Sequence, residues 1–144
     1  MPAFSAISMA VDTNHNVYYS MDSADSNYRS KIFKLAAGSA TPVLLAGGGT
    51  SINLDGVGSA VAFCQSGSGL LFFGHDGVLY IVDDSNNRLC MLFPNNGSVV
   101  TIPTDDSLVL AKGRTMATGT AGRVFVRLWT TWFACFLQAI LRRS

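Results

Sequence analysis

A short strand–turn–strand pattern occurs three times along the 144 residues, and this repetition limits the folds that the chain can adopt. The copies span residues 10–19, 73–83 and 117–126. Each copy joins two β-prone segments through a turn rich in Gly, Asn, Asp or Thr. When Tyr18, Tyr80 and Phe125 are aligned, the copies are 62 and 45 residues apart. The second spacing suits a four-stranded repeat unit of about 40–50 residues, and the first suits a unit with a long insertion.

The first two copies continue in the same way, with a polar turn and two further apolar segments. Lys31 and Arg88 open the equivalent third segments. The pattern predicts complete four-stranded antiparallel meanders over about residues 4–46 and 68–103, and half of another over 114–127. The fold class is therefore predicted to be all-β.

Composition excludes several classes of protein. Hydrophobic residues make up 49% of the chain and charged residues 13%, so a disordered charged tail is excluded. A net charge of +1 argues against electrostatic binding of nucleic acid. The three cysteines form no C-x-x-C pair and are predicted to be buried thiols in a reducing compartment. No secretory signal is visible at the N-terminus, which favours a cytoplasmic location.

Four ordered segments resemble one known family. They are the glycine-containing segment 45–49, the segment 55–63, the strand-forming segment 76–83 and the Asn-Asn-Arg-Leu segment 86–89. Their order and gaps resemble the blade-to-blade connector and signature repeat of the NHL-repeat β-propellers. The resemblance covers about residues 7–127 and is strongest over 43–103. It implies propeller blades, with Tyr18, Tyr80 and Phe125 packing between neighbouring blades.

The number of blades is too small for a closed propeller. The chain supplies about two and a half, whereas propellers close with roughly four to eight. An open arc leaves apolar sheet faces uncovered. The chain is therefore expected to be a fragment of a larger propeller; the alternative is that it closes by self-association.

The segment 128–144 departs from the repeat, and its largely apolar residues 128–141 include no charged residue. Three interpretations stay open for it. It is a membrane-associated tail over 128–143, for which a helix is one conformation, the remaining strands of a degenerate blade, or a segment foreign to the ancestral fold, such as a frame-shifted end.

The turns supply the candidate ligand contacts. These residues are His15, His75, Asp83, Asp84, Asn86, Asn87 and Arg88. The Asp12-x-Asn14-x-Asn16 segment begins like a calcium loop, but Val17 occupies the position that requires Gly, so a hairpin turn is predicted. No catalytic residue, metal-ligand set or cofactor is predicted.

The resemblance implies a non-enzymatic interaction scaffold with a protein partner. In some NHL proteins a basic face binds RNA, and Lys31, Arg88 and Arg123 would contribute to such a face here. Pairing of Lys31 and Arg88 with acids such as Asp22 and Asp83 is the stronger interpretation. The alternatives are a metal-assisted lyase or hydrolase whose other ligands lie on missing blades, and a membrane-tethered propeller.

Overall fold

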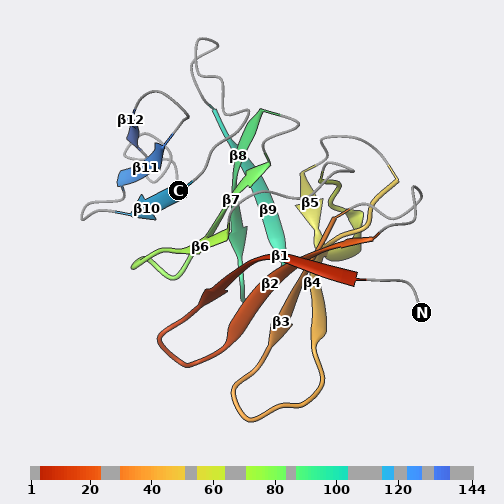
Figure 1. The fold of residues 1–144 in the computed structure, drawn as a ribbon. Helices are drawn as coiled ribbons and strands as arrows, with labels where there is room; N and C mark the ends of the chain where they lie inside the picture. The colour runs from red at the N-terminus through yellow and green to blue at the C-terminus, as the bar shows by residue number, and fades with distance from the viewer. Residues whose placement is uncertain are drawn as a thin grey trace.

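The computed structural model describes residues 4–23, 30–50, 55–63, 71–83, 87–103, 115–118, 123–127 and 132–136. These residues form three antiparallel sheets and one short 3-10 helix, η1 (Gly58–Ala60) (Figure 1). The all-β prediction is confirmed. Within these ranges, no helix is long and apolar enough to cross a membrane.

The first sheet is a four-stranded meander. Its strands, in spatial order, are β1 (Phe4–Val11), β2 (Val17–Ser23), β3 (Lys31–Leu35) and β4 (Val43–Gly47). Strand β1 contains a bulge between Ala6 and Ser8, and the pairing of β3 with β4 is irregular after Ile32. Bulges increase the local twist of a sheet, which favours the strongly twisted shape of a blade.

The second sheet is also a meander, to which the preceding connector adds a fifth strand. The strands are β5 (Gly56–Val57), β6 (Leu71–Phe73), β7 (Leu79–Asp83), β8 (Arg88–Phe93) and β9 (Ser98–Ile102). The spatial order is β5-β9-β8-β7-β6, because Gly56 pairs with Val99 and Val57 with Ser98. The connector predicted over 55–63 therefore forms an edge strand of the sheet that follows it.

The third sheet contains β10 (Thr115–Thr118), β11 (Arg123–Arg127) and β12 (Trp132–Phe136). Strand β12 falls within the apolar tail and pairs with β11, with Phe125 opposite Ala134. A helical tail is therefore wrong for residues 132–136. The reason is that these apolar residues complete backbone hydrogen bonds along the open edge of β11. Residues 128–131 and 137–144 lie outside the described residues.

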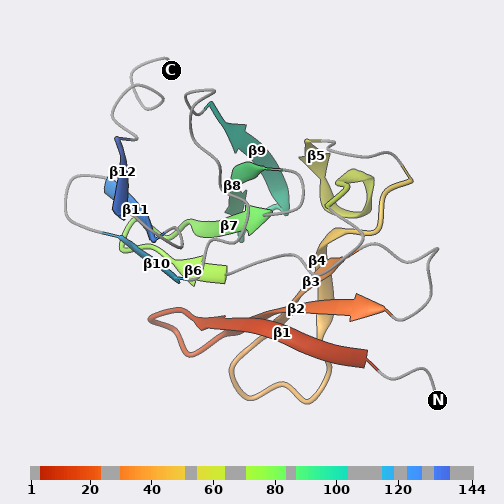
Figure 2. The same ribbon diagram turned by 45° about the horizontal axis from the view of Figure 1, so that its top comes forward.

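The core lies between the first and second sheets, and the views in Figures 1 and 2 both show these sheets side by side. Tyr18, Ile32 and Ala46 contribute from the first sheet. Leu79, Ile81, Cys90, Leu92 and Val99 contribute from the second, and Val61 and Phe63 of the connector fill the space between them. The ring of Tyr18 stacks on Phe73 at 5.5 Å between centroids.

Strands β1, β6 and β10, which begin the three meanders, lie close together. Strand β6 contacts both β1 and β10, and the Leu71 amide donates a hydrogen bond of 2.9 Å to the Ser8 hydroxyl. Tyr80 is also buried, but it lies next to Ile81 in β7 and so faces away from the shared core. Strand β7 is buried on both faces, which makes the second sheet the central layer.

Gly97→Ala tests the close approach between the first two sheets. Gly97 has a φ of +71°, and a Cβ there would lie 2.5 Å from the Leu45 carbonyl oxygen. Gly38→Ala is the matched control, because Gly38 has a φ of +76° and open space around it. We expect Gly38→Ala to cost about 1–2 kcal/mol in unfolding free energy, the cost of a left-handed residue with a Cβ. Gly97→Ala should cost at least about 1 kcal/mol more in urea unfolding. Equal losses would contradict the observed approach.

Candidate functional site

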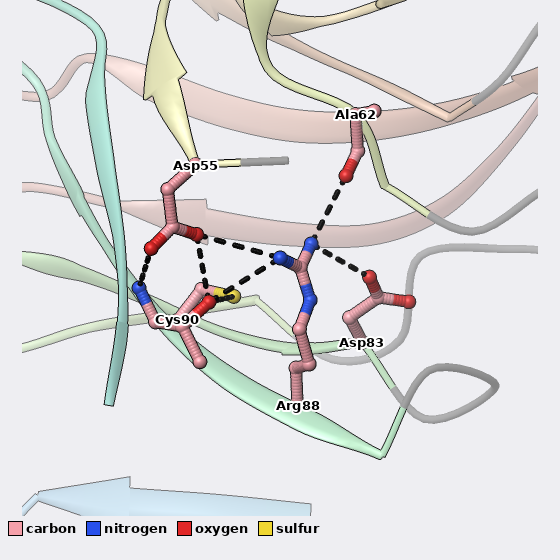
Figure 3. A network of polar contacts seen from close by, with 6 residues as sticks. Asp55, Ala62, Asp83, Arg88 and Cys90 are labelled. Carbon is pink, nitrogen blue, oxygen red and sulfur yellow. Dashed lines mark hydrogen bonds and ion pairs between the residues drawn. The ribbon is translucent and has the colours of Figure 1, made fainter. Parts of the chain in front are cut away.

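A buried arginine joins the connector to the second sheet. Arg88 opens β8 directly opposite Asp83, the last residue of β7, and Cys90 lies opposite Thr101 of β9. Because side chains alternate along a strand, Asp83, Arg88, Cys90 and Thr101 all lie on the face that packs against the first sheet. Figure 3 shows Asp55 and Ala62 approaching this group from the connector.

The Arg88 guanidinium contacts four groups. Its Nη1 lies 3.4 Å from Asp55 Oδ1 and donates to Thr101 Oγ1 at 3.3 Å. Its Nη2 lies 3.3 Å from Asp83 Oδ2 and donates to the Ala62 carbonyl at 3.0 Å. The pairing of Arg88 with Asp83 that the sequence predicted is therefore confirmed. Asp83 is fully buried, so this ion pair lies in the low-dielectric interior.

Asp55 extends the network to the edge of the sheet. Its carboxylate accepts hydrogen bonds from the Thr101 amide at 2.8 Å and from the Thr101 hydroxyl at 2.7 Å. The Asp55 side chain is 43% exposed, so its ion pair with Arg88 is partly screened by solvent. The sequence indicated only a turn at Asp55-Gly56. Its contact with Thr101 spans 46 residues, and no local pattern indicates it.

Cys90 lies beside this network without the features of a reactive thiol. Burial raises the pKa of Cys90 to about 11, although the positive charge of Arg88 acts in the opposite direction. Its sulfur lies 3.9 Å from Thr101 Oγ1. A thiol with a raised pKa is protonated at neutral pH and is a weak nucleophile. Cys90 therefore acts as a small apolar core residue, as predicted; Cys64 and the side chain of Cys135 lie outside the described residues.

Two hairpin turns are closed by the same pair of residue types. In the turn between β1 and β2, Asp12 Oδ2 accepts from the Tyr18 hydroxyl at 2.9 Å. In the turn between β6 and β7, Asp76 Oδ2 accepts from the Tyr80 hydroxyl at 2.6 Å. Asp12 also accepts the backbone amides of Asn14 and Asn16, and Asp76 accepts the backbone amide of Val78. The hairpin turn predicted for residues 12–16 is confirmed.

Asp12, Tyr18 and Tyr80 have pKa values that differ from their ordinary values. Burial raises the pKa of Asp12, but hydrogen bonds from Asn16, Tyr18 and Asn14 outweigh this effect, and the net pKa is lowered. Burial is the largest cause of the raised pKa of both Tyr18 and Tyr80, followed by the hydrogen bond to the carboxylate. Both phenols therefore remain protonated donors at neutral pH.

The candidate contact residues fall into two groups. His15 and His75 are exposed in the β1–β2 and β6–β7 turns, which lie on the same side of the molecule in Figures 1 and 2. Asp83 and Arg88 are buried at the opposite ends of β7 and β8 from the His75 turn. Asn87 is exposed beside them with a φ of +51°, and Asp84 and Asn86 lie outside the described residues. The structure does not bring the two groups together.

Comparison with known proteins identifies the architecture. The sequence matches neither the model of any known protein family nor any curated protein. A solved streptogramin B lyase structure matches with a TM-score of 0.53 and 14% sequence identity, covering 84% of this chain and 33% of the lyase chain. That protein is a β-propeller.

The fold is that of β-propeller blades.

The 144 residues thus span about a third of the propeller that they match. A sequence identity of 14% supports a conclusion about the fold and about nothing further.

Arg88→Met tests the buried network. The substitution keeps an unbranched apolar side chain but removes the cation beside the buried Asp83 carboxylate, so we expect a loss of about 3–5 kcal/mol in unfolding free energy. The double variant Asp83→Asn/Arg88→Met should recover part of this loss. Asp55→Asn is the control at the exposed end and should cost about 1 kcal/mol or less. Full stability of Arg88→Met in urea unfolding would show that the network does not hold the connector.

The lowered pKa of Asp12 predicts a contribution to folding stability that is lost in acid. Because its folded pKa lies below its ordinary value, the stabilisation is complete above about pH 4 to 5 and is lost as the pH falls through the folded pKa. We expect wild-type stability to exceed that of Asp12→Asn at pH 6, with the difference shrinking toward pH 2. In Tyr18→Phe, one donor to the carboxylate is lost, and an NMR titration should show a higher Asp12 pKa. An unchanged titration would argue against the hydrogen bond.

Proposed function

We propose that this chain is part of a non-enzymatic interaction scaffold built from NHL-type propeller blades. The observation that carries the proposal is the repeated hairpin turn. Two consecutive blades, packed through one core, present His15 and His75 on turns that are each closed by an Asp–Tyr hydrogen bond. Loops held on a rigid β scaffold are the usual position of binding residues.

The chemistry of the turns favours a protein partner. The exposed residues of the first turn are polar and include Thr13, Asn14 and His15, while His75 and Gly77 are exposed in the second. Such turns offer hydrogen-bond donors and acceptors without a strong electrostatic field. This combination suits the polar rim of a protein interface. The net charge of +1 supports a protein over RNA.

The remaining blades of the scaffold come from outside these 144 residues. The chain spans a third of the matching propeller, and its repeat resembles a connector followed by a blade. A longer protein that contains this segment is one source of those blades, and association with other chains is another. The NHL assignment rests on the sequence segments over 43–103, since the structural likeness supports a propeller in general.

A metal-assisted lyase or hydrolase is the second candidate, because the matching propeller is named a lyase. In this alternative the two exposed histidines would contribute to a site completed by other blades. No group of three or more His, Cys, Asp or Glu that could hold a metal ion occurs among the described residues. The test is to measure bound metal and the consumption of streptogramin B by the purified chain. Turnover that is abolished by His15→Asn/His75→Asn would overturn the scaffold proposal.

Site-specific photo-crosslinking tests the binding role of the turns. A photoreactive residue is placed at position 15, at position 75, or at the exposed control position Ser59 of the connector. We expect one protein from a native extract to crosslink at positions 15 and 75 and not at 59. The purified partner should then bind His15→Asn/His75→Asn about 10-fold or more weakly, a loss of about 1.4 kcal/mol. Asn suits position 15, where φ is +63°. Equal crosslinking at all three positions would contradict the proposal.

A further inference from the structure

The outer face of the first sheet carries apolar residues that are exposed or half-buried in the part of the chain that the structure describes. Four residues form a row across the sheet on this face: Met9 lies opposite Tyr19, Tyr19 opposite Phe33, and Phe33 opposite Leu44. The rings of Tyr19 and Phe33 stack with their centroids 5.6 Å apart. Met9 is 63% exposed and Leu44 37% exposed at the two ends of the row.

A second apolar row lies beside the first. Val11 pairs with Val17, and Val17 pairs with Leu35. Val11 is exposed, and the other two are half-buried. Contiguous apolar surface of this kind marks an interaction site in a soluble protein.

The second sheet shows what covers the equivalent face of a blade. With Tyr18 aligned on Tyr80, the pairs Val17–Leu35 and Tyr19–Phe33 correspond to Leu79–Leu92 and Ile81–Cys90. Those four residues of the second sheet are fully buried, because they lie in the core shared with the first sheet and the connector. The outer face of the first sheet is thus the equivalent blade face, and among the described residues its side chains are exposed or half-buried where those of the second sheet are fully buried.

We propose that a second copy of this chain covers this face, placing its last sheet, β10–β12, where a preceding blade would lie. The contact repeats in trans the blade-on-blade packing that already joins the first and second sheets within the chain. The contact joins the two ends of the blade series, so two copies related by a twofold rotation make it twice, with the first sheet of each copy on the last sheet of the other, and the pair closes. Two copies with three sheets each supply six sheets, within the four to eight blades of closed propellers.

The near-neutral charge of the chain is compatible with this association. A net charge of +1 produces little repulsion between copies. The inference depends on the packing of the blades and is independent of the proposed binding role of the turns.

Sedimentation of matched variants tests the association. Met9→Asp and Leu44→Asp place a carboxylate on the outer face of the first sheet. Val57→Asp is the control, because Val57 is similarly exposed, at 58%, but lies on the connector strand β5. At concentrations from about 1 to about 100 μM, wild type and Val57→Asp should sediment as a species of twice the 15.3 kDa chain mass. The two face variants should dimerise at least about 10-fold more weakly.

A wild-type monomer at every concentration would overturn the proposal, and so would a dimer that Met9→Asp leaves unchanged. A second measurement uses the wild-type chain alone and does not depend on the folding of a variant. The rate of Met9 oxidation by hydrogen peroxide should fall as the protein concentration rises, because the second copy covers the thioether. A rate independent of concentration would also overturn the proposal.

Discussion

The contacts of Arg88 hold together parts of the chain that local structure alone would leave separate. One guanidinium bonds to the connector at Asp55 and Ala62 and to the second sheet at Asp83 and Thr101. The connector also carries Val61 and Phe63 into the core between the first two sheets. The connector therefore helps to hold the two blades against each other. Each blade needs such a neighbour, because a single blade cannot bury both of its faces.

The turns at the other end of the blades are stabilised in a different way. Each of the first two repeats uses a carboxylate that accepts from both its own turn and a buried tyrosine. The third repeat has Phe125 at the aligned position, and its turn sequence Gly-Thr-Ala-Gly over 119–122 contains no acid. Both partners of the pair are thus absent together in the sequence, as expected if a buried tyrosine hydroxyl requires its acceptor.

The repeat pattern predicted most of the fold because each blade is built from local hairpins. The strands around Tyr18 and Tyr80, the hairpin at Asp12 and the Asp83–Arg88 pair all depend on residues close together in the sequence. The pairing of β5 with β9 and the Asp55–Thr101 contact were not predictable in this way. They depend on the path of the connector, which brings together residues more than 40 positions apart.

The candidate site was predicted only in part for the same reason. The sequence grouped His15, His75 and residues 83–88 because all of them lie in turns. Strand direction places the two histidine turns at one end of the blades, while Asp83 and Arg88 face inward at the other end. The predicted meander already places successive turns at opposite strand ends, but the turn residues were grouped as one contact set by their polarity and not by the end of the blade that they occupy.

The short strand β5 has a consequence for the solubility of the chain. An exposed sheet edge presents free amides and carbonyls that can template the addition of a strand from another molecule. Gly56 and Val57 pair with the start of β9, and the Asp55 carboxylate accepts the amide of Thr101 further along the same edge. One dipeptide and one side chain thus block strand addition at the outer edge of the central blade. The connector protects the chain against edge-to-edge aggregation as well as joining its blades.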